Sequence, residues 1–345
     1  MVAKLKKEIT GNVLNYQLFI TKHLKRKSVL SFLLYPLSIF FTIIVVLRRF
    51  LYTKIPILTY KSKFKIISVG NITSGGTGKT PFTIFLANHL IEKKKQIAIV
   101  LRGYKGKYEN TTTLITSTNE TYVSDEVSLY TAKLSNVPIC VGKNRIKSLK
   151  LLQEKYPSLD YVIMDDAFQH LKVYQDTKIC IFHTQNPIGN GFCLPAGILR
   201  EPISALKYVD YLVFNGNKND LSQSMLKRFE SFGKPIFEGE YVLKEIKDFS
   251  GKLYDIETIK TSKNMLLSGI GSPKSFEDSI SKFGISFEYH LFQNDHFEYT
   301  EAFLEQNQID FEKYDYILTT EKDYSKLKGI RTNLPFLVVC VNWTP

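Results

Sequence analysis

A Gly-rich stretch between an apolar run and a helical pattern constrains the fold of this chain more than any other feature. Residues 66–89 read IISVGNITSGGTGKTPFTIFLANH, and the turn in the middle ends in Gly78, Lys79 and Thr80. Glycines allow consecutive backbone N–H groups to wrap phosphate oxygens, and the N-terminus of the following helix adds partial positive charge. In such a loop the lysine reaches the β- and γ-phosphates, and the threonine hydroxyl binds Mg²⁺. The order of strand, glycine turn, GKT and helix therefore predicts a site for nucleotide phosphates.

This stretch departs from the strict pattern G-x-x-x-x-G-K-[ST] at its first position, where Thr73 stands in place of glycine. A plain glycine turn would explain the glycines, but it would leave Lys79 without a role. We therefore expect one unbroken run of residues to hold the nucleotide phosphates. The run consists of Thr73, Ser74, Gly75, Gly76, Thr77, Gly78, Lys79 and Thr80.

A second motif supplies acidic side chains for a metal ion. Residues 161–164 read YVIM, an apolar strand pattern, and Asp165 and Asp166 follow it directly. A carboxylate at the carboxyl end of a strand beside the phosphate loop can hold Mg²⁺ directly or through water. An apolar strand followed by Asp is also an ordinary turn, so this prediction depends on the phosphate loop. His170 follows on the same loop, where it either contacts nucleotide or substrate or only caps the turn.

Two further segments carry candidate side chains with weaker support. Asp125 and Glu126 open a predicted helix, where acidic residues favour the helix dipole, and a catalytic base is the alternative role for Asp125. A Gly- and Pro-rich loop over residues 189–201 ends in Arg200 and Glu201. Such a loop can place Arg200 to bind a phosphate in fork geometry, although surface Arg–Glu pairs are common. His296 follows a predicted strand, and a lone histidine of this kind is usually structural.

One tetrapeptide suggests a different nucleotide. Residues 217–220 read NKND and match the guanine-reading pattern N-K-x-D of GTPases. Asn215 and Gly216 separate this tetrapeptide from the preceding strand, which shifts it by two residues. The tetrapeptide is also common in a sequence rich in lysine and asparagine. A GTPase that uses Asn217–Asp220 therefore remains a weaker alternative.

The net charge of +13 lies almost entirely at the N-terminus. Residues 1–65 contain 13 lysines and arginines and a single acidic residue, whereas the other 280 residues contain 33 basic and 32 acidic residues. A nucleic-acid-binding protein more often carries its basic patch on the folded domain. The charge distribution therefore indicates a basic module attached to a nearly neutral body, with no nucleic acid partner.

The same N-terminal region contains 19 consecutive residues without a charge, residues 29–47, which Arg48 and Arg49 follow. As a helix, this segment spans about 28 Å, close to the thickness of a bilayer core. Pro36 is expected to kink or break the helix early. The basic flanks would attract anionic headgroups by about 1 kcal/mol per charge. We expect a bent helix that inserts into or spans a membrane, and a buried helix of a soluble domain is the alternative.

From residue 65 onward, apolar strand patterns alternate with helical patterns. Strands are expected over residues 66–69, 97–101, 138–141, 161–164, 179–182 and 211–214, and helices over residues 79–92, 126–134 and 145–155. A polar segment over residues 104–124 is expected to form a loop or hairpin over the site. Unbroken apolar strands that alternate with helices are typical of a parallel sheet with helices on both faces.

A break is expected near residues 232–242, after which the alternation resumes. Strands are expected over residues 265–268, 286–292, 316–319 and 336–341, and helices over residues 274–283 and 301–308. The predicted fold is α/β: a P-loop NTPase-like parallel sheet, a smaller second α/β domain and an N-terminal membrane-associated helix. The expected parts are a basic membrane-associated segment (residues 1–60), a P-loop domain (61–232), which the resemblance described next implies to be a kinase domain, and the smaller domain (233–345).

Taken in order, these motifs resemble the tetraacyldisaccharide 4′-kinase family of lipid A biosynthesis. The single motifs are weak, but the ordered set is highly specific and extends from about residue 30 to residue 325. The stretches that carry the resemblance are LLYPLS (33–38), VGNITSGGTGKTP (69–81), RGYKGK (102–107), SDE (124–126), DDAFQH (165–170), GNGFCLPAGILRE (189–201), DYLVFNG (210–216), DHF (295–297) and TEKD (320–323).

The resemblance implies a reaction, cofactors and a location. The family phosphorylates the 4′-hydroxyl of a tetraacylated glucosamine disaccharide 1-phosphate with ATP and Mg²⁺, at the cytoplasmic face of the inner membrane. Its smaller domain is joined by a hinge, and the active site lies in the cleft between the domains. The implied partners are the acylated substrate and anionic inner-membrane lipids. No obligate protein partner is evident from the sequence.

The resemblance also implies roles for particular residues. Asp125 matches the general base of the family, and His296 matches its partner from the second domain. The implied catalytic residues are Asp125, His296 and Lys79; the implied substrate residues are Arg145, Arg200 and His170; and the implied metal residues are Thr80, Asp165, Asp166 and Glu201.

Two alternatives of other classes remain beside the GTPase. A membrane-bound regulatory or positioning NTPase would share the GGTGKT loop but would not need residues 189–201 or a distant DHF. A membrane scaffold with an inactive nucleotide site is poorly supported, because Lys79, Thr80, Asp165 and Asp166 are all present.

Overall fold

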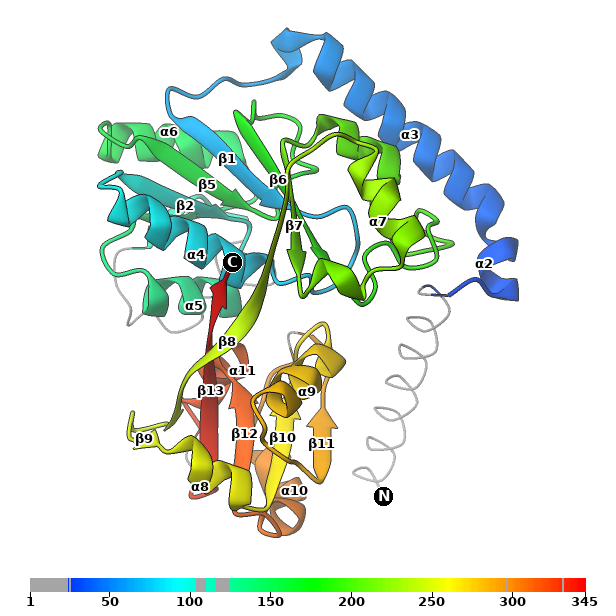
Figure 1. Cartoon of the computed structure of the whole chain (residues 1–345). Coiled ribbons are helices and arrows are strands. Elements are labelled where there is room, and N and C mark those ends of the chain that lie inside the picture. The colour runs from blue at the N-terminus through cyan, green and yellow to red at the C-terminus, as the bar shows by residue number, and fades with distance from the viewer. Residues whose placement is uncertain (1–23, 25, 104–109, 116–123, 296, 331) are drawn as a thin grey trace.

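The computed structural model describes residues 24, 26–103, 110–115, 124–295, 297–330 and 332–345. Figure 1 shows two halves, each built on strands with helices packed around them, and two long strands that run between the halves. Thirteen strands of the described residues form one continuous sheet, in the order β11-β10-β12-β13-β8-β7-β6-β1-β5-β2-β4-β3, and β9 pairs with β8.

The first half contains the strands that precede and flank the glycine-rich turn. These strands, in order across the sheet, are β3 (Thr113–Ile115), β4 (Ile139–Val141), β2 (Ile97–Leu101), β5 (Tyr161–Asp165), β1 (Lys65–Gly70), β6 (Thr177–His183), β7 (Tyr211–Asn215) and β8 (Ile236–Asp248). All neighbouring pairs are parallel except β3 with β4. Val69 of β1 lies opposite Asp165 of β5, so the segments that follow these two strands emerge at the same edge of the sheet.

Helices cover both faces of this half, as the unbroken apolar strands predict. The helices are α4 (Lys79–Glu92), α5 (Asp125–Lys133), α6 (Arg145–Lys155) and α7 (Gln223–Glu230). Ile97 and Ile99 of β2 pack with α4 and α5 on one face, whereas Ala98 and Val100 pack with α6 on the other. Phe229 of α7 packs with β6 and β7 on the same face as α6. The predicted fold class is confirmed.

The second half is smaller and mixed in strand direction. Its strands are β13 (Phe336–Thr344), β12 (Tyr316–Thr320), β10 (Asn264–Ser268), β11 (Tyr289–Phe292) and β9 (Leu253–Tyr254), and its helices are α8 (Ile256–Thr261), α9 (Pro273–Lys282), α10 (Glu301–Phe311) and α11 (Glu321–Leu327). Strands β11, β10, β12 and β13 are parallel, and β8 runs antiparallel to β13. Two apolar clusters, one on each face, form its core.

Strand β8 begins at Ile236, within the segment where a break is expected, and continues to Asp248, so the chain passes from the first half to the second within a strand. Gly239 lies within this strand. A Cβ atom there would clash with the ring of Trp343 on the neighbouring strand β13. The glycine therefore allows close approach of two strands, which is a recognised use of glycine inside a sheet. β8 and β13 connect the two halves in Figure 1.

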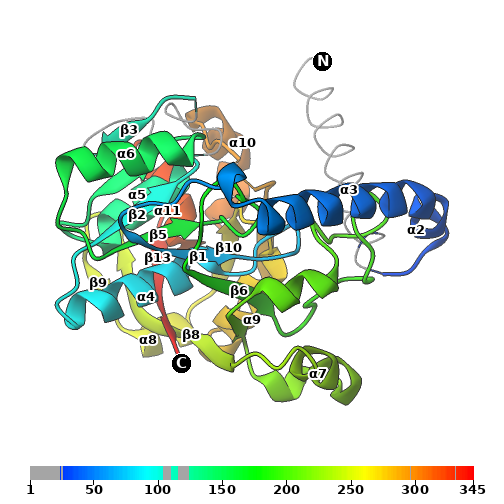
Figure 2. The same ribbon diagram turned by 90° about the horizontal axis from the view of Figure 1, so that it is seen from above.

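The N-terminal helix differs from its predicted bounds. The expected helix over residues 29–47 is divided into α2 (Val29–Leu33) and α3 (Tyr35–Lys54), and Pro36 lies in the first turn of α3, where proline is tolerated. Helix α3 continues through Arg48 and Arg49, seven residues past the predicted end. It is long and apolar enough to cross a membrane by length and composition. Figures 1 and 2 show α3 along the outside of the first half.

Candidate active site

The glycine-rich turn forms the N-terminus of α4, as the sequence predicts. Gly78 precedes the helix with a φ of 79°, a left-handed conformation that favours glycine. The side chain of Asn215, at the end of β7, donates to the carbonyl of Thr77, and Asn71 Nδ2 donates to Thr77 Oγ1 at 3.0 Å. The N–H of Ser74 donates to the carbonyl of Ile198 at 2.7 Å. Three neighbouring segments therefore hold the loop in place.

The loop faces a cavity of about 560 Å³, which also contacts the second half. A volume of this size is in the range of sites for small molecules and cofactors. The first half contributes the loop, Glu126, Asp165, Asp166 and Arg200. The second half contributes an apolar wall, which consists of Ile270, Phe276, Phe283, Val339 and Val341.

Five of the predicted site residues lie together at the mouth of the loop. Thr80 Oγ1 donates to Asp165 Oδ2 at 3.3 Å, and Lys79 Nζ lies 3.5 Å from Asp166 Oδ1. Arg200 Nη1 donates to both oxygens of Asp166, at 3.0 and 3.1 Å. The motifs over residues 73–80, 165–166 and 200 therefore form one cluster of charged and hydroxyl groups.

The two aspartates of this cluster differ in electrostatics. Burial raises the pKa of Asp165, although Lys79 and the Tyr130 hydroxyl, 2.7 Å from Asp165 Oδ2, favour its charged form. Burial also opposes ionisation of Asp166, but Lys79 and Arg200 outweigh it and hold its pKa below the ordinary value. Asp166 is thus a stable anion, whereas Asp165 lacks sufficient compensating charge.

The donor set near Asp165 fits Mg²⁺. A threonine hydroxyl and an aspartate carboxylate are hard oxygen ligands, and the raised pKa of Asp165 indicates that its anion would be stabilised by a cation. Among the described residues, no three His, Cys, Asp or Glu side chains form a group that would hold a metal ion. Mg²⁺ commonly takes one or two protein ligands and completes its shell with waters and nucleotide phosphates.

Glu126 belongs to the same cluster, although the sequence argument assigned it only to the start of a helix. Burial raises its pKa to about 7, and the nearby negative charge of Asp165 adds to this shift. Lys322 of α11 and Lys79 oppose the shift. The signal that could have identified Glu126 was its place beside Asp125 in the motif SDE.

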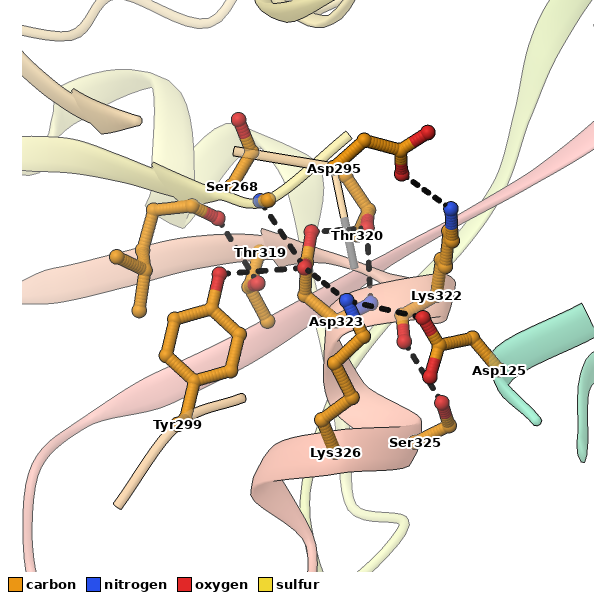
Figure 3. Close-up of polar contacts among 12 residues, drawn as sticks. Asp125, Ser268, Asp295, Tyr299, Thr319, Thr320, Lys322, Asp323, Ser325 and Lys326 are labelled. Carbon is orange, nitrogen blue, oxygen red and sulfur yellow. Dashed lines mark hydrogen bonds and ion pairs between the residues drawn. The ribbon is translucent and has the colours of Figure 1, made fainter. Parts of the chain in front are cut away.

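Asp125 lies at the first position of α5 and contacts the second half. Its Oδ2 is 3.1 Å from Lys326 Nζ on α11, which is also 3.6 Å from Asp323 Oδ1 (Figure 3). One turn earlier on α11, Lys322 Nζ lies 2.5 Å from Asp295 Oδ1. His296, the predicted partner of Asp125, lies outside the described residues.

Comparison with known proteins places this arrangement in a family. Residues 30–345 match the family model for tetraacyldisaccharide-1-phosphate 4′-kinase. The chain belongs to this family.

Relatives with the same name support the assignment over most of the chain. The tetraacyldisaccharide 4′-kinase of Ruthia magnifica is 34% identical over 307 residues, 88% of this chain and 90% of that protein. The enzyme of Francisella tularensis subsp. novicida is 34% identical over 313 residues, 88% of this chain and 92% of that protein. The crystal structure of LpxK from Aquifex aeolicus in complex with ATP is 29% identical, with a TM-score of 0.71 over 91% of this chain and 95% of that chain.

Of the residues matched to substrate positions of the 4′-kinase family, Arg145 is buried and His170 is half-buried. Arg145 Nη1 donates to the carbonyl of Gly142 at 2.6 Å, and burial lowers its pKa to about 10, against the attraction of Asp165 and Asp166. Burial lowers the pKa of His170 to about 4, with a further contribution from Arg145, so His170 is neutral at pH 7. Its backbone forms a turn with Ala167.

Glu201, which the 4′-kinase family resemblance implied as a metal residue, has a partner that the sequence did not indicate. Both of its carboxylate oxygens accept hydrogen bonds from the guanidinium of Arg49 on α3, at 2.5 and 2.6 Å. Glu201 therefore has a buried cationic partner in this structure.

The tetrapeptide that suggested a GTPase lies on the surface. Asn217 caps the short 3₁₀ helix η3 (Lys218–Asp220), and Lys218 pairs with Glu238 at 3.3 Å. These contacts give Asn217–Asp220 a structural role at the end of β7. As members of the 4′-kinase family, the chain and its relatives give no support to the GTPase alternative.

Proposed function

We propose that this chain transfers the γ-phosphoryl group of ATP to the 4′-hydroxyl of a tetraacylated glucosamine disaccharide 1-phosphate. Family membership across residues 30–345 carries this proposal. The cluster of Lys79, Thr80, Asp165, Asp166 and Arg200 supports it, because it combines cationic groups for phosphate with oxygen ligands for Mg²⁺ at one end of the phosphate loop. The relative solved in complex with ATP supports the choice of nucleotide.

The residues of this chain would then divide the work as follows. The loop over residues 73–80 and the N-terminus of α4 hold the phosphates, and Lys79 contacts the γ-phosphate. Thr80 and Asp165 would hold Mg²⁺, which when bound neutralises charge on the phosphoryl oxygens. Arg145, Arg200 and His170 are the proposed substrate contacts.

Asp125 is the proposed general base. The 4′-hydroxyl oxygen forms a bond to the γ-phosphorus, the bond from that phosphorus to the bridging oxygen of ADP breaks, and the hydroxyl proton passes to the Asp125 carboxylate. A positioned base of this kind contributes about 10²- to 10⁴-fold. Lys326 holds the carboxylate from the second half. Lys322 pairs with Asp295 one turn before Lys326 on α11. His296 is the proposed partner of the base.

Membrane attachment follows from the same proposal. Helix α3 presents exposed apolar side chains, among them Phe40, Ile43 and Leu47, and this face would insert into the cytoplasmic leaflet of the inner membrane. Basic residues around the helix would bind anionic headgroups. The substrate could then keep its acyl chains in the bilayer while its sugar reaches the site. We further propose that residues 61–232 and 233–345 act as two domains that close over the cleft and exclude water.

A direct assay tests the proposal. The purified chain, ATP, Mg²⁺ and the disaccharide 1-phosphate lipid should yield a bisphosphorylated lipid detectable by mass spectrometry. The variant Asp125→Asn should lose at least about 100-fold in kcat while its Kd for ATP stays within about twofold. Asp220→Asn is the matched control, because it removes the same charge from the NKND tetrapeptide and should leave kcat unchanged.

Each other outcome has a definite meaning. A folded, ATP-binding sample that yields no lipid product would reject the kinase proposal. A preference for GTP that Asp220→Asn abolishes would favour the GTPase. Full turnover of Asp125→Asn would remove Asp125 from the role of base.

A further inference from the structure

We propose that Arg49 of helix α3 is a positioning residue of the active site. The apolar helix would then be part of the frame that holds the reacting groups, in addition to any role in membrane attachment. The effect on turnover rests on the proposed kinase function. The positioning itself has a separate readout, described below.

The guanidinium of Arg49 forms a buried, two-pronged ion pair with Glu201. Arg49 Nε and Nη2 donate to the two carboxylate oxygens at 2.5 and 2.6 Å, and the two side chains are only 5% and 3% exposed. Arginine suits this contact because its planar fork matches the geometry of a carboxylate. Removal of one partner from such a pair leaves an uncompensated charge in a low-dielectric environment.

Arg49 also holds a second loop. Its Nη2 donates to the carbonyl of Phe168 at 3.0 Å, and its guanidinium carbon lies 4.2 Å from the centre of the Phe168 ring. Phe168 follows Asp166 by two residues. One side chain of α3 thus connects the loop that ends in Glu201 with the loop that begins at Asp165.

These two loops carry groups of the proposed active site. Arg200 adjoins Glu201 and donates to both oxygens of Asp166. The backbone N–H of Arg200 donates to the carbonyl of Ile72 at 2.7 Å, just before the phosphate loop. A shift of the Glu201 backbone would therefore move Arg200 relative to Asp166, and a shift of Phe168 would move Asp166 itself.

Other residues of α2 and α3 also contact the loop over residues 189–201. Ser38 Oγ donates to the carbonyl of Cys193 at 2.7 Å, and Asn190 Nδ2 donates to Ser31 Oγ at 3.2 Å. The ring of Phe192 lies 4.8 Å from the ring of Tyr35, centre to centre. The loop is thus held against α2 and α3 at several points, and Arg49 provides the contact nearest to Arg200.

A purely structural role for the pair is the alternative, and a double substitution separates the two. Replacing both members of a buried ion pair with apolar residues is often neutral or favourable for stability, whereas loss of one member is costly. Arg49→Met should therefore lower both Tm and kcat. Arg49→Met/Glu201→Met should recover Tm but keep kcat at least tenfold below wild type, because the fork that holds both loops is still missing.

Kinetic measurements use the full chain with lipid substrate in mixed micelles. Arg49→Lys keeps the charge but loses the planar fork, and it should lower kcat at least threefold with Kd for ATP within twofold. Arg228→Met is the kinetic control, because it removes one positive charge from an exposed position of α7, and it should leave kcat unchanged. Lys54→Met removes one positive charge from an exposed position of α3 and serves as the control for hydrogen–deuterium exchange.

Two results would overturn the proposed positioning role of Arg49. Recovery of kcat together with Tm in the double variant would show a purely structural pair and would overturn the proposal. If the methionine variants fail to fold, Arg49→Lys decides, and an unchanged kcat in that variant would likewise overturn it.

Hydrogen–deuterium exchange gives a readout that does not depend on a lipid acceptor. In Arg49→Lys and Arg49→Met, peptides that cover residues 165–170 and 189–201 should exchange faster than in Lys54→Met. If wild-type protein has no kinase activity, the proposed function fails while this comparison still tests the positioning. Equal exchange in all variants would reject it.

Discussion

At the scale of single residues, Asp166 concentrates the constraints of the site. Its φ of 47° lies in the left-handed region, which a residue with a side chain seldom adopts. Its own N–H donates to Asp165 Oδ1 at 2.8 Å, and Arg200 and Lys79 hold its carboxylate. An uncommon backbone conformation persists only where surrounding contacts determine it, and such conformations cluster at functional sites.

The position of Arg200 beside Asp166 leads to a prediction. Arg200 Nη1 alone contacts both Asp166 oxygens, which leaves its other guanidinium nitrogens for the proposed substrate phosphate. Arg200→Lys should lower kcat by about tenfold or more, because a lysine has one ammonium nitrogen and lacks the planar fork for that phosphate. Steady-state kinetics with the lipid substrate measures this loss. Arg228→Lys, at an exposed position of α7, serves as the control, and equal kcat values for the two variants would contradict the proposed role of Arg200.

Glu126 leads to a prediction about pH. Its pKa is about 7 in the folded protein against 4.5 as a reference, so between these values the folded state binds more protons than the unfolded state. Stability therefore falls as pH rises from 4.5 to 7, by on the order of 3 kcal/mol. Glu126→Gln has no titrating carboxyl group at this position, so its stability should not fall in this way.

Thermal unfolding without nucleotide or metal tests the pH argument. Glu126→Gln and wild type should unfold at similar temperatures near pH 4.5. Between pH 4.5 and pH 7 the Tm of the variant should rise progressively above that of wild type, and above pH 7 the difference in Tm should stay constant. Glu154→Gln, at an exposed position, should show no such trend. A pH-independent difference for Glu126→Gln would contradict the assignment.

At the scale of elements, the two faces of helix α3 have different environments. Its inner face contacts loop residues through Ser38 and Arg49, whereas Ile43 is 58% exposed on its outer face. Because only one face of α3 contacts the first half, the other face keeps exposed apolar side chains that could enter a membrane. Pro36, which the sequence marked as a break, allows the turn between α2 and α3.

The exposed face of α3 predicts how membrane binding responds to one charge. Ile43→Asp should weaken binding to vesicles roughly tenfold or more, because an acidic group near the middle of a membrane-inserted helix is costly. Sedimentation with vesicles of anionic and of zwitterionic lipid measures the affinity. Ile91→Asp, an equivalent change at an exposed position of α4, should bind as wild type does, and equal loss in both variants would argue against insertion of α3.

Local signals predicted several elements to the residue. The expected ranges 79–92, 97–101 and 145–155 coincide with α4, β2 and α6. Each has an uninterrupted pattern and a clear end. Helix α11 was not predicted, because seven mostly polar residues give too short a pattern. Strand β8 was not predicted either, and the close approach of Gly239 to Trp343 within it depends on a strand more than 100 residues later.

At the scale of the whole molecule, the two halves meet through strands and charges. β8 connects them covalently, β13 pairs along β8, and α5 contacts α11 through two ion pairs. Lys133 Nζ lies 2.5 Å from Glu321 Oε1, at the far end of α5 from Asp125. The position of α11 over the cleft therefore depends in part on charge.

A charge reversal tests this dependence. Lys133→Glu places like charges opposite each other and should lower kcat several-fold through a cost of about 1 kcal/mol to the closed arrangement. The swap Lys133→Glu/Glu321→Lys should regain most of the loss. Kinetics together with small-angle scattering would measure both effects, and a swap that is no better than the single variant would exclude a direct charge interaction.

Local sequence patterns were enough to predict the phosphate loop, the acidic end of the strand over residues 161–164 and the α/β fold. These features are local, because a nucleotide phosphate is held by consecutive N–H groups and by side chains adjacent to Gly78 and Asp165. Hydrophobic periodicity likewise depends on neighbours a few residues apart.

Which charged side chains form ion pairs depends on the tertiary structure and could not be predicted from local sequence. Arg49 pairs with Glu201 across 152 residues of sequence, and Asp125 meets Lys326 on the other half of the molecule. Glu126 joined the cluster of Asp165 for the same reason. A buried charge takes whichever opposite charge the fold brings within a few ångströms, and no local pattern contains that choice.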